Sequence, residues 1–490
     1  MRPLLYVLFL FCGSLAAQRV TGTIVDVDND PVPYATIQVG RLVGTMSNIE
    51  GKFSINTAQL KPTDLVQITY IGYKPIEITV ADLLEKDIFI LEKDVLSLNE
   101  VLVTNKKFTA EELIAKVLEN ADSNYRDITY QRKAFIRHSD EFLPSRLELD
   151  LKKSSLVSKK ELKEINKEFL EKEKRIKGKS SKSFTENLVD YARHEDSIVA
   201  RVIKSTILIN KRDDLSTDKL AEDAQELVLR HLEPGRTYKL KSGLFTIDDS
   251  LEVNVDERKK KTYKDSVSSW SMGSNIKELI RSSNVKSFQK DFLRELKRYD
   301  YVLEDAVSYH GKTVYVLSFS PGRRSADYVG KLYINADDFA IVKMDYRIAD
   351  NRDGEGINLK LLLGVKMRVK DAATSVTFTQ TDQGNYLPQL IKQSSTSYIY
   401  INRPFKIKLN RIDKDEEKKQ MKFKILVEAL STEETEVMFM DYAALDKDEF
   451  DSIEIKPRYP IEYLDRYDSS LWEDYNILPA IKELEEYKTE

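Results

Sequence analysis

Residues 19–40 read RVTGTIVDVDNDPVPYATIQVG, and this stretch decides the fold of the first part of the chain. Apolar residues alternate with polar or small ones over 20–24 and again over 35–39, which is the period of a β-strand with one buried face. Between the two, Asp28-Asn29-Asp30-Pro31 is typical of a turn. The stretch therefore predicts two short strands joined by a turn.

The alternation continues as far as residue 94 without any helical period. A second turn is expected at Asn48-Ile49-Glu50-Gly51, where glycine suits a position at which a side chain would clash. Short strands this close together favour a small antiparallel β-sandwich. The further strands are expected at 52–55, 65–70, 76–80 and 88–91.

Four spaced elements of this region resemble the carboxypeptidase regulatory-like domain, a prealbumin-like sandwich common at the N-termini of exported Gram-negative envelope proteins. The resemblance covers a domain at 18–94, and the segment 98–103 resembles the edge that often closes it. It implies a fold and an envelope setting but no peptidase activity, because in carboxypeptidases this domain is the accessory one. The four elements are Val20-x-Gly22-x-Ile24, Pro33-Tyr34-Ala35-Thr36-Ile37-x-Val39, Gly51-x-Phe53 and Tyr70-Ile71-Gly72-Tyr73.

The run Asp26-Val27-Asp28-Asn29-Asp30 presents alternating carboxylates, which are ligands that calcium accepts. The run has no glycine at the next position and no glutamate closing a twelve-residue loop. We therefore interpret it as a solvated hairpin turn.

Residues 1–17 have the layout of a secretory signal peptide, with one positive charge, a short apolar stretch and small residues up to Ala17. A membrane anchor is less well supported, because the apolar stretch falls short of the ~20 residues that a bilayer needs. Cys12 follows the bulky Phe11, whereas a lipid-modified bacterial cysteine needs a small residue there. We expect an exported protein that is periplasmic or associated with the outer membrane.

Composition excludes several classes of protein. The 77 Lys and Arg residues nearly balance the 81 Asp and Glu residues, so the basic excess of a nucleic-acid-binding protein is missing. One cysteine and four histidines leave almost nothing from which to build a thiolate or imidazole metal site.

The rest of the chain predicts an α+β region after a linker at 95–107. A mainly helical region with some strands is expected at 108–300, with Thr109 as an N-cap and Glu112 three residues on. Strand-period segments then predict an antiparallel sheet at 301–430, and a tail with a terminal helix at 431–490. The predicted fold is thus multidomain: an all-β sandwich, then a large antiparallel sheet, which can form a half-barrel, with several helices. The helices are expected at 108–120, 158–177 and 220–232, within 276–299, and at 477–490.

This second region resembles a family of unknown function in which a regulatory-like domain precedes a periplasmic part and a C-terminal outer-membrane barrel. The residues that carry the resemblance are Leu113–Asn120, Asn124-Tyr125, Phe135–Arg137 and the pair Gly330–Ile334 and Phe339–Ile341. The last pair also resembles the strand pair of lipoprotein-carrier-like half-barrels. The chain departs from the family beyond about residue 405, because its C-terminal stretch is too short and too charged for a complete barrel.

Enzyme signatures fail, so we predict no catalytic, cofactor-binding or metal-binding residues and no cofactor. His194-Glu195 begins a zincin pattern, but Ile198 stands where the second histidine is needed. His138-Ser139-Asp140-Glu141 has the His-x-x-Glu spacing of a carboxypeptidase zinc site, yet the possible third ligands His231 and His310 lie in no ligand context. We interpret this spacing as chance.

Two features leave a binding role open. Arg323-Arg324 could hold an anionic group, although a solvated turn is the better interpretation. The helix expected at 158–177 has a narrow apolar stripe that could dock a partner, although packing on its own domain is the better interpretation.

These observations favour a non-catalytic envelope protein that binds or scaffolds, with a sheet groove that shelters a lipid or a peptide segment. The expected partners are an outer-membrane or periplasmic protein, a lipid or a peptide, and no nucleic acid. The alternatives are an envelope hydrolase of the metallopeptidase type and an accessory protein of a TonB-dependent uptake system.

Overall fold

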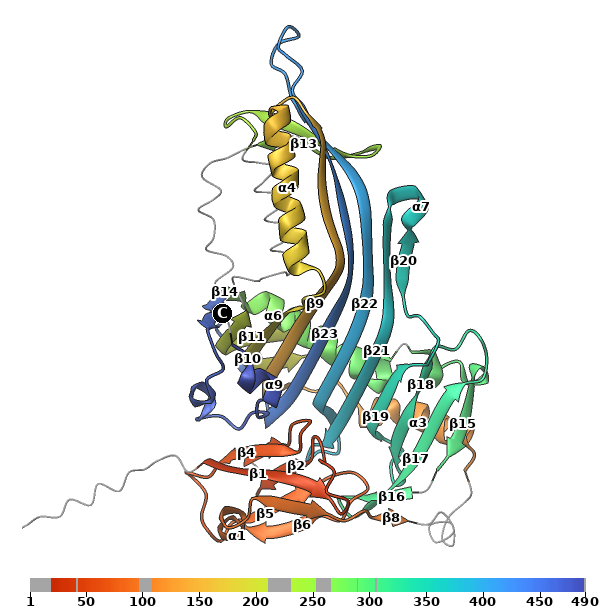
Figure 1. Ribbon diagram of the computed structural model, residues 1–490. Coiled ribbons are helices and arrows are strands. Elements are labelled where there is room, and N and C mark those ends of the chain that lie inside the picture. Colours follow the sequence, from red (N-terminus) through yellow and green to blue (C-terminus); the bar gives the residue numbers. More distant parts are fainter. Residues whose placement is uncertain are drawn as a thin grey trace, which may run out of the picture. The chain divides into compact units, whose positions relative to one another are not determined.

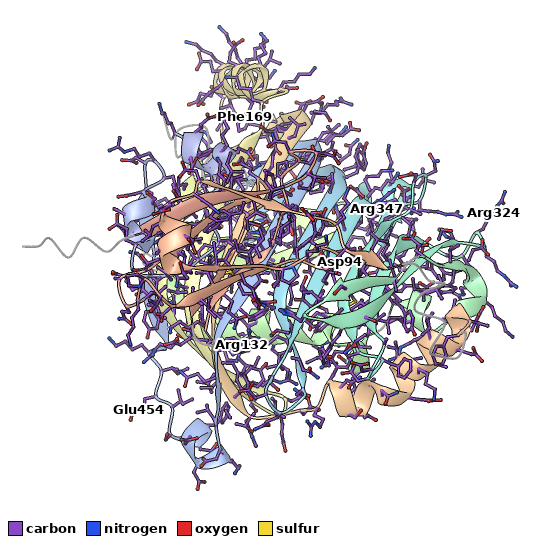
Figure 2. The ribbon with its side chains drawn as sticks, turned by 90° about the horizontal axis from the view of Figure 1, so that it is seen from below. Asp94, Arg132, Phe169, Arg324, Arg347 and Glu454 are labelled. Carbon is purple, nitrogen blue, oxygen red and sulfur yellow. The ribbon has the colours of Figure 1, made fainter. Side chains whose placement is uncertain are left out.

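The computed structural model describes residues 19–40, 43–96, 108–209, 231–252, 266–288, 290–304 and 306–488 (Figure 1). The predicted signal peptide, the closing edge at 98–103 and most of the helix expected at 220–232 lie outside these residues. The described chain divides into two compact units. Figure 2 draws their side chains and labels Asp94 of unit 1 and Arg132 of unit 2. Unit 1 comprises Met1–Val95, Val307–Gly311 and Asp468–Glu485, and unit 2 comprises Leu96–Ala306, Lys312–Tyr467 and Glu486–Glu490.

Unit 1 is a β-sandwich of two small sheets, which confirms the predicted N-terminal fold. One sheet has the order β4-β1-β7 and the other β3-β2-β5-β6. The short strands β8 and β16 lie where the chain passes from one unit to the other. The bounds are β1 (Arg19–Asp26), β2 (Thr36–Val39), β3 (Val43–Met46), β4 (Lys52–Asn56), β5 (Leu65–Thr69), β6 (Ile76–Thr79), α1 (Val80–Leu84), β7 (Ile88–Leu91), β8 (Val95–Leu96) and β16 (Ala306–Tyr309).

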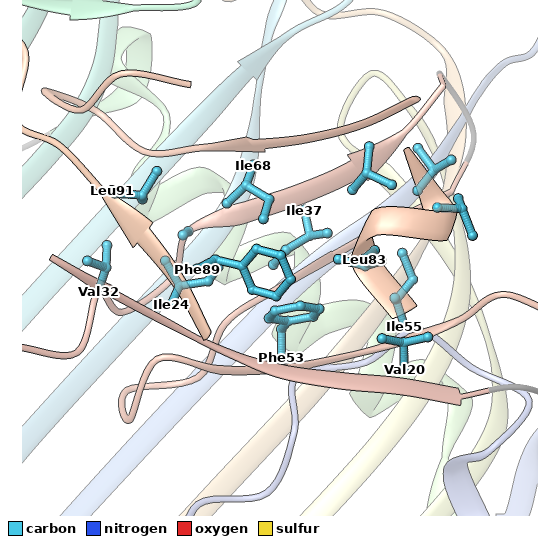
Figure 3. Packing of buried hydrophobic residues seen from close by; sticks show 14 residues of the cluster. Val20, Ile24, Val32, Ile37, Phe53, Ile55, Ile68, Leu83, Phe89 and Leu91 are labelled. Atoms are coloured by element: carbon cyan, nitrogen blue, oxygen red, sulfur yellow. The ribbon is translucent and has the colours of Figure 1, made fainter. Parts of the chain in front are cut away.

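Alternating apolar residues from both sheets form the core of unit 1, as Figure 3 shows. The rings of Phe53 and Phe89 lie 5.6 Å apart at its centre. A Cβ at Gly22 would lie 2.6 Å from the Phe53 ring, which explains why glycine stands there. The Asp26 carboxylate accepts hydrogen bonds from the backbone N–H groups of Asp28 and Asp30, so this acidic run is a hairpin turn held by its own side chain.

The C-terminal segment 468–485 completes unit 1, although the sequence predicted only a tail. Arg19 donates to the backbone carbonyl of Trp472 at 2.8 Å, and Asn48 donates to that of Ala480 at 2.9 Å. The terminal helix is shorter than expected, because the segment makes these contacts in an extended form. Its helical parts are the 3₁₀ turn η5 (Ser469–Trp472) and α9 (Lys482–Glu486).

The helices of unit 2 begin at capping residues. Thr109 caps α3 and Ser158 caps α4, each with a glutamate three residues later that bonds back to the cap. The helix predicted within 276–299 begins earlier and ends at Ser283, because Asn284 is extended and caps a 3₁₀ turn. The bounds are α3 (Ala110–Asn124), α4 (Lys159–Ile176), α6 (Ser269–Ser283), η2 (Val285–Ser287), η3 (Asp291–Leu293), η4 (Leu296–Arg298), α7 (Lys360–Leu363) and α8 (Lys447–Asp451). Among the described helices, none is long and apolar enough to cross a membrane.

One large, mainly antiparallel sheet organises unit 2, in the order β25-β11-β10-β9-β23-β22-β21-β19-β18-β17. β12 and β13 extend it beside β22, β15 pairs with β17 and β20 with β21, while β14 and β24 pair separately. The bounds are β9 (Tyr130–Ser154), β10 (Ser181–His194), β11 (Ser197–Ile209), β12 (Thr237–Ser242), β13 (Phe245–Glu252), β14 (Ser266–Ser268), β15 (Tyr299–Leu303), β17 (Lys312–Pro321), β18 (Tyr328–Asn335), β19 (Ile341–Ile348), β20 (Gly356–Leu359), β21 (Val365–Gln380), β22 (Tyr386–Leu409), β23 (Gln420–Ala444), β24 (Arg458–Pro460) and β25 (Glu462–Leu464).

Two sequence boundaries differ from the structure. Within the described part of 108–300, strand residues outnumber helix residues, because β9, β10 and β11 fill most of 130–209. The boundary at 430 falls inside β23. In both places charged side chains alternate with apolar ones along a strand, and their density resembles that of a solvated helix or tail.

The large sheet has two different faces. We call inner the face that carries Phe423, Ile425, Val427 and Ala429 of β23, and outer the opposite face. α4 packs over the inner face near the strand ends, and α6 packs over the inner face at β11, where a Cβ at Gly273 would lie 3.7 Å from that of Ala200. Figure 1 shows α4 running along β9.

Candidate binding face of the large sheet

An apolar strip crosses four strands on the inner face. Direct pairing across β21, β22, β23 and β9 places its residues in two adjacent rows, because residues directly opposite on neighbouring strands point to the same side. The rows are Val365, Ile401, Val427 and Leu147, and Met367, Ile399, Ala429 and Pro144.

The strip is only partly covered. The side chain of Met367 is 47% exposed, while Ile399, Ile401 and Val427 are of intermediate burial. Apolar surface left in water costs about 25 cal/mol per Å². A row of partly exposed apolar side chains on a sheet face is therefore the kind of surface that a ligand covers favourably.

At one end the strip joins the cluster beneath α4. Ile165 of α4 is buried there with Leu151, Met421 and Phe423 of the sheet. The rings of Phe405 and Phe423 stack at 5.3 Å, so this end is closed by packed side chains. The apolar stripe expected on this helix thus packs on its own unit.

At the other end the strip meets a polar band. His138 Nδ1 lies 2.8 Å from Thr435 Oγ1, and His138 Nε2 lies 3.0 Å from Asp140 Oδ2. The hydrogen bond with Asp140 raises the pKa of His138, against the opposing effect of burial. The residues of the band pair directly across β21, β22, β23 and β9: Ser397 with Ser431, Ser395 with Glu433 and Asp140, and Thr374 with Gln393, Thr435 and His138.

Two buried polar atoms lie next to this band on the inner face. Asn187 is 5% exposed and Ser205 is 3% exposed. Within the described part of the chain, neither Asn187 Oδ1 nor Ser205 Oγ has a hydrogen-bond partner. Buried polar atoms normally have partners, so these two are available to a water or to a polar ligand group.

A buried arginine holds the opposite end of the inner face. Arg132 donates to the backbone carbonyls of Pro388 at 2.7 Å and Phe439 at 3.0 Å, so it ties β22 and β23 together from β9. By contrast, Arg324 lies in an exposed turn between β17 and β18 and extends away from the ribbon in Figure 2. A solvated turn is therefore what the structure places at Arg323-Arg324.

The structure also separates the residues of the zinc-like spacing. His138 and Asp140 share the inner face of β9, whereas Glu141 points to the outer face, so His138 and Glu141 cannot ligate one ion. His194 stands at the end of β10, where its Nδ1 lies 2.7 Å from Oγ1 of Thr129, the residue before β9. His194 is therefore separated from His138, which lies within β9. Across the described residues, no group of three or more His, Cys, Asp or Glu side chains is placed to hold a metal ion.

Sequence reasoning did not find the apolar strip. Its signal is present in 399–409, IYINRPFKIKL, where apolar residues alternate with polar or charged ones over most of the segment. The rows themselves depend on strand register, which one sequence does not reveal.

Comparison with solved structures finds likenesses at very low identity. The chain is similar to a LolA superfamily protein from Nitrosomonas europaea, with 10% identity, a TM-score of 0.18, and coverage of 71% of this chain and 99% of that one. The chain is also similar to a lipoprotein-sorting protein domain from Vibrio parahaemolyticus, with 8% identity and a TM-score of 0.19. That likeness covers 70% of this chain and 97% of the other. A third likeness is to the MucA/MucB complex of Pseudomonas aeruginosa, with 10% identity and a TM-score of 0.16. It covers 65% of this chain and 93% of the other.

The family comparison concerns the N-terminal part of the chain. No curated protein matches the sequence. Residues 20–103 match the model of the CarboxypepD_reg-like domain, which confirms the resemblance found in the sequence. The structure describes most of this range as the sandwich of unit 1. The chain therefore carries a CarboxypepD_reg-like domain at residues 20–103.

Proposed function

We propose that this protein is a non-catalytic binding protein of the cell envelope that shelters an amphipathic lipid on the inner face of its large sheet. The apolar strip carries the proposal. With strands about 4.8 Å apart, four strands make the strip about 14 Å wide. Each methylene group of an acyl chain that the strip removes from water contributes about 0.8 kcal/mol to binding. A bound acyl chain would also cover the apolar side chains of the strip that the fold leaves partly exposed.

The polar band gives the ligand a direction. An acyl chain on the strip would place its polar end at His138 and the adjacent serine and threonine hydroxyls, because the opposite end is closed by the α4 cluster. The hydroxyls of the band bond to a head group of either charge, while protonated His138 is balanced by Asp140 and Glu433, so the band does not by itself select an anionic head group.

An envelope location rests on the N-terminal part of the chain. The CarboxypepD_reg-like domain resembles those of exported Gram-negative proteins, and residues 1–17 predict a signal peptide. Both support the periplasm or the periplasmic side of the outer membrane as the place of action.

The test compares charges introduced on opposite faces of the same sheet. Met367→Glu puts a carboxylate into the strip, whereas Leu430→Glu puts one on the outer face, where the side chain is 39% exposed. We expect Met367→Glu to weaken binding of a fluorescent fatty acid about tenfold or more, because a charge must then be desolvated beside the chain. Leu430→Glu should bind as the unmodified protein does.

Native mass spectrometry of the mature protein from its own envelope fraction identifies the occupant. A retained lipid that Met367→Glu loses supports the proposal. Thermal unfolding must first show that both variants are folded. Equal fatty-acid binding by both variants, or a retained peptide in place of a lipid, overturns it.

A further inference from the structure

A row of lysines crosses the outer face of the sheet at the strand ends, behind α4. Direct pairing joins Lys241 of β12 to Lys406 of β22, Lys406 to Lys422 of β23, and Lys422 to Lys153 of β9. We call these four residues the lysine row. Directly opposite side chains lie about 5 Å apart at Cβ, a spacing at which like charges destabilise a sheet.

Neighbouring lysines strengthen the repulsion. Lys239 and Lys408 form the next pair toward the strand ends, on the same face. Burial, together with the charges of Lys422, Lys408 and Lys241, lowers the pKa of Lys406.

The row lacks the counter-charges that nearby lysines have. Lys239 forms an ion pair with Asp249, and Lys419 with Glu233. Among the described residues, no carboxylate lies within ion-pair distance of the four lysines of the row. The chain as a whole carries a net charge of −4, so this positive surface is a local feature and not a consequence of composition.

An exposed apolar tip adjoins the row. The turn after β12 carries Leu244, which is 97% exposed, and Ile247 of β13 is 56% exposed. Phe245 between them pairs with Ser242 and therefore points to the inner side, away from Lys241. β12 supplies Lys239 and Lys241 to the basic surface and also leads directly into this tip. The apolar and basic features therefore belong to one hairpin.

We propose that the lysine row and the tip Leu244–Ile247 dock unit 2 on a bilayer surface whose lipids carry anionic phosphate head groups. Basic side chains beside exposed apolar ones are the combination that binds such surfaces: the cations meet the phosphates and the apolar residues enter the head-group layer. An acidic protein would meet the cations but would leave the apolar tip in water. The proposal concerns the outer face and does not depend on what the inner face binds.

Vesicle co-sedimentation with the full mature chain tests the proposal. We expect binding to vesicles that contain about one third phosphatidylglycerol, weak binding to vesicles of phosphatidylcholine alone, and a loss of binding as salt screens the charges over a Debye length of ~8 Å at physiological ionic strength. Equal binding to both kinds of vesicle overturns the proposal.

Matched variants locate the surface. Each lysine near an anionic surface contributes about 1 kcal/mol, so Lys406→Gln with Lys422→Gln should weaken binding roughly 30-fold. The control, Lys297→Gln with Lys456→Gln, removes the same amount of charge at exposed positions outside the row. It should change the affinity for the vesicles less than about twofold.

The apolar part is tested separately. Leu244→Ser with Ile247→Ser should also weaken binding to the anionic vesicles while leaving the salt dependence in place, because the lysines remain. If both lysine pairs weaken binding equally, the attraction is unspecific and the proposal fails. Binding to polyglutamate but not to the vesicles assigns the row to an acidic protein and overturns the proposal.

Discussion

Two charged rows cross the outer face of the same sheet and are built in opposite ways. The lower row pairs Glu186, Arg137, Glu436 and Lys392 directly across β10, β9, β23 and β22, so that the charge alternates in sign. The lysine row crosses neighbouring strands with a single sign. In the lower row Arg137 is 4% exposed and Glu186 is fully buried, whereas in the lysine row Lys153 and Lys422 are exposed and Lys241 and Lys406 are half-buried.

The lower row satisfies its own charges. Arg137 lies 2.7 Å from Glu186 and 3.7 Å from Glu436, and Lys392 lies 3.7 Å from Glu436. Burial by itself lowers the pKa of Arg137, but the carboxylates of Glu186 and Glu436 outweigh it and the net shift is upward. The charges of the lower row thus have partners within the fold, whereas the four lysines of the lysine row have no carboxylate partner among the described residues.

The largest effect is expected in the lower row. Arg137→Met leaves Glu186 buried without its cation, which should lower the free energy of unfolding of unit 2 by about 3–5 kcal/mol in urea denaturation. Arg201→Met provides the control, because Arg201 pairs with Asp190 but its side chain is 54% exposed. That variant should lose about 1 kcal/mol or less.

The double variant Arg137→Met, Glu186→Leu sharpens this result. Replacing both buried charges by apolar groups removes the desolvation cost together with the attraction, so it should recover most of the loss. A single variant that costs no more than Arg201→Met would show that the lower row is not a self-satisfied structural element.

A smaller effect of opposite sign is expected in the lysine row. Lys406→Glu places a carboxylate among Lys241, Lys408 and Lys422 and should raise the free energy of unfolding by up to about 1 kcal/mol. The same variant should lose binding to anionic vesicles. Greater stability with less binding is the pattern of a surface kept for a partner.

Lys331→Glu is the matched control for this prediction. Lys331 lies on the outer face of β18 and pairs with Glu304 at 2.7 Å, so the same substitution there creates repulsion and should destabilise slightly. If both variants shift stability in the same direction, the two lysines do not differ in the way that the rows require.

The two rows also show what one sequence can and cannot predict. Unit 1 was predicted because its signals are local: strand alternation, turns, and glycines such as Gly22 beside the Phe53 ring. α3 was predicted from its N-cap, Thr109. The C-terminal part of unit 1 was missed because Arg19 bonds to the backbone carbonyl of Trp472. Every residue has such a carbonyl, so the contact cannot be recognised from residue types.

Of the strands that carry the rows, β22 and the first part of β23 fall in the sheet predicted at 301–430, whereas β9, β10 and β12 fall in the region predicted as mainly helical. Arg137 and Glu186 are charged residues in buried positions, so they break the alternation by which a strand is recognised. The four residues of the lysine row come from four separate strands, and only the register unites them. The same is true of the apolar strip, so the candidate site as a whole lay beyond local patterns.

The smallest effect is expected for the charged pair on the inner face, His138 with Asp140, which resembles neither row because it is half-exposed. The pKa of His138 is raised above its ordinary 6.5, chiefly by the hydrogen bond with Asp140. Since the folded pKa exceeds the unfolded one, the pair should stabilise the fold fully below about pH 6.5 and lose this contribution as the pH rises through the folded value. An exposed pair of this kind contributes at most about 1 kcal/mol.

Titration of His138 by NMR measures this shift directly, and Asp140→Asn should lower the pKa toward its ordinary value. The same variant should flatten the difference in unfolding free energy between pH 5.5 and pH 8.5, since the proton would no longer bind more tightly to the folded chain. Glu433 also faces His138 and contributes to the raised pKa, so part of the shift should survive the variant. A pKa that Asp140→Asn leaves unchanged would assign the shift to Glu433 and to the backbone of Glu434, and would remove Asp140 from the pair.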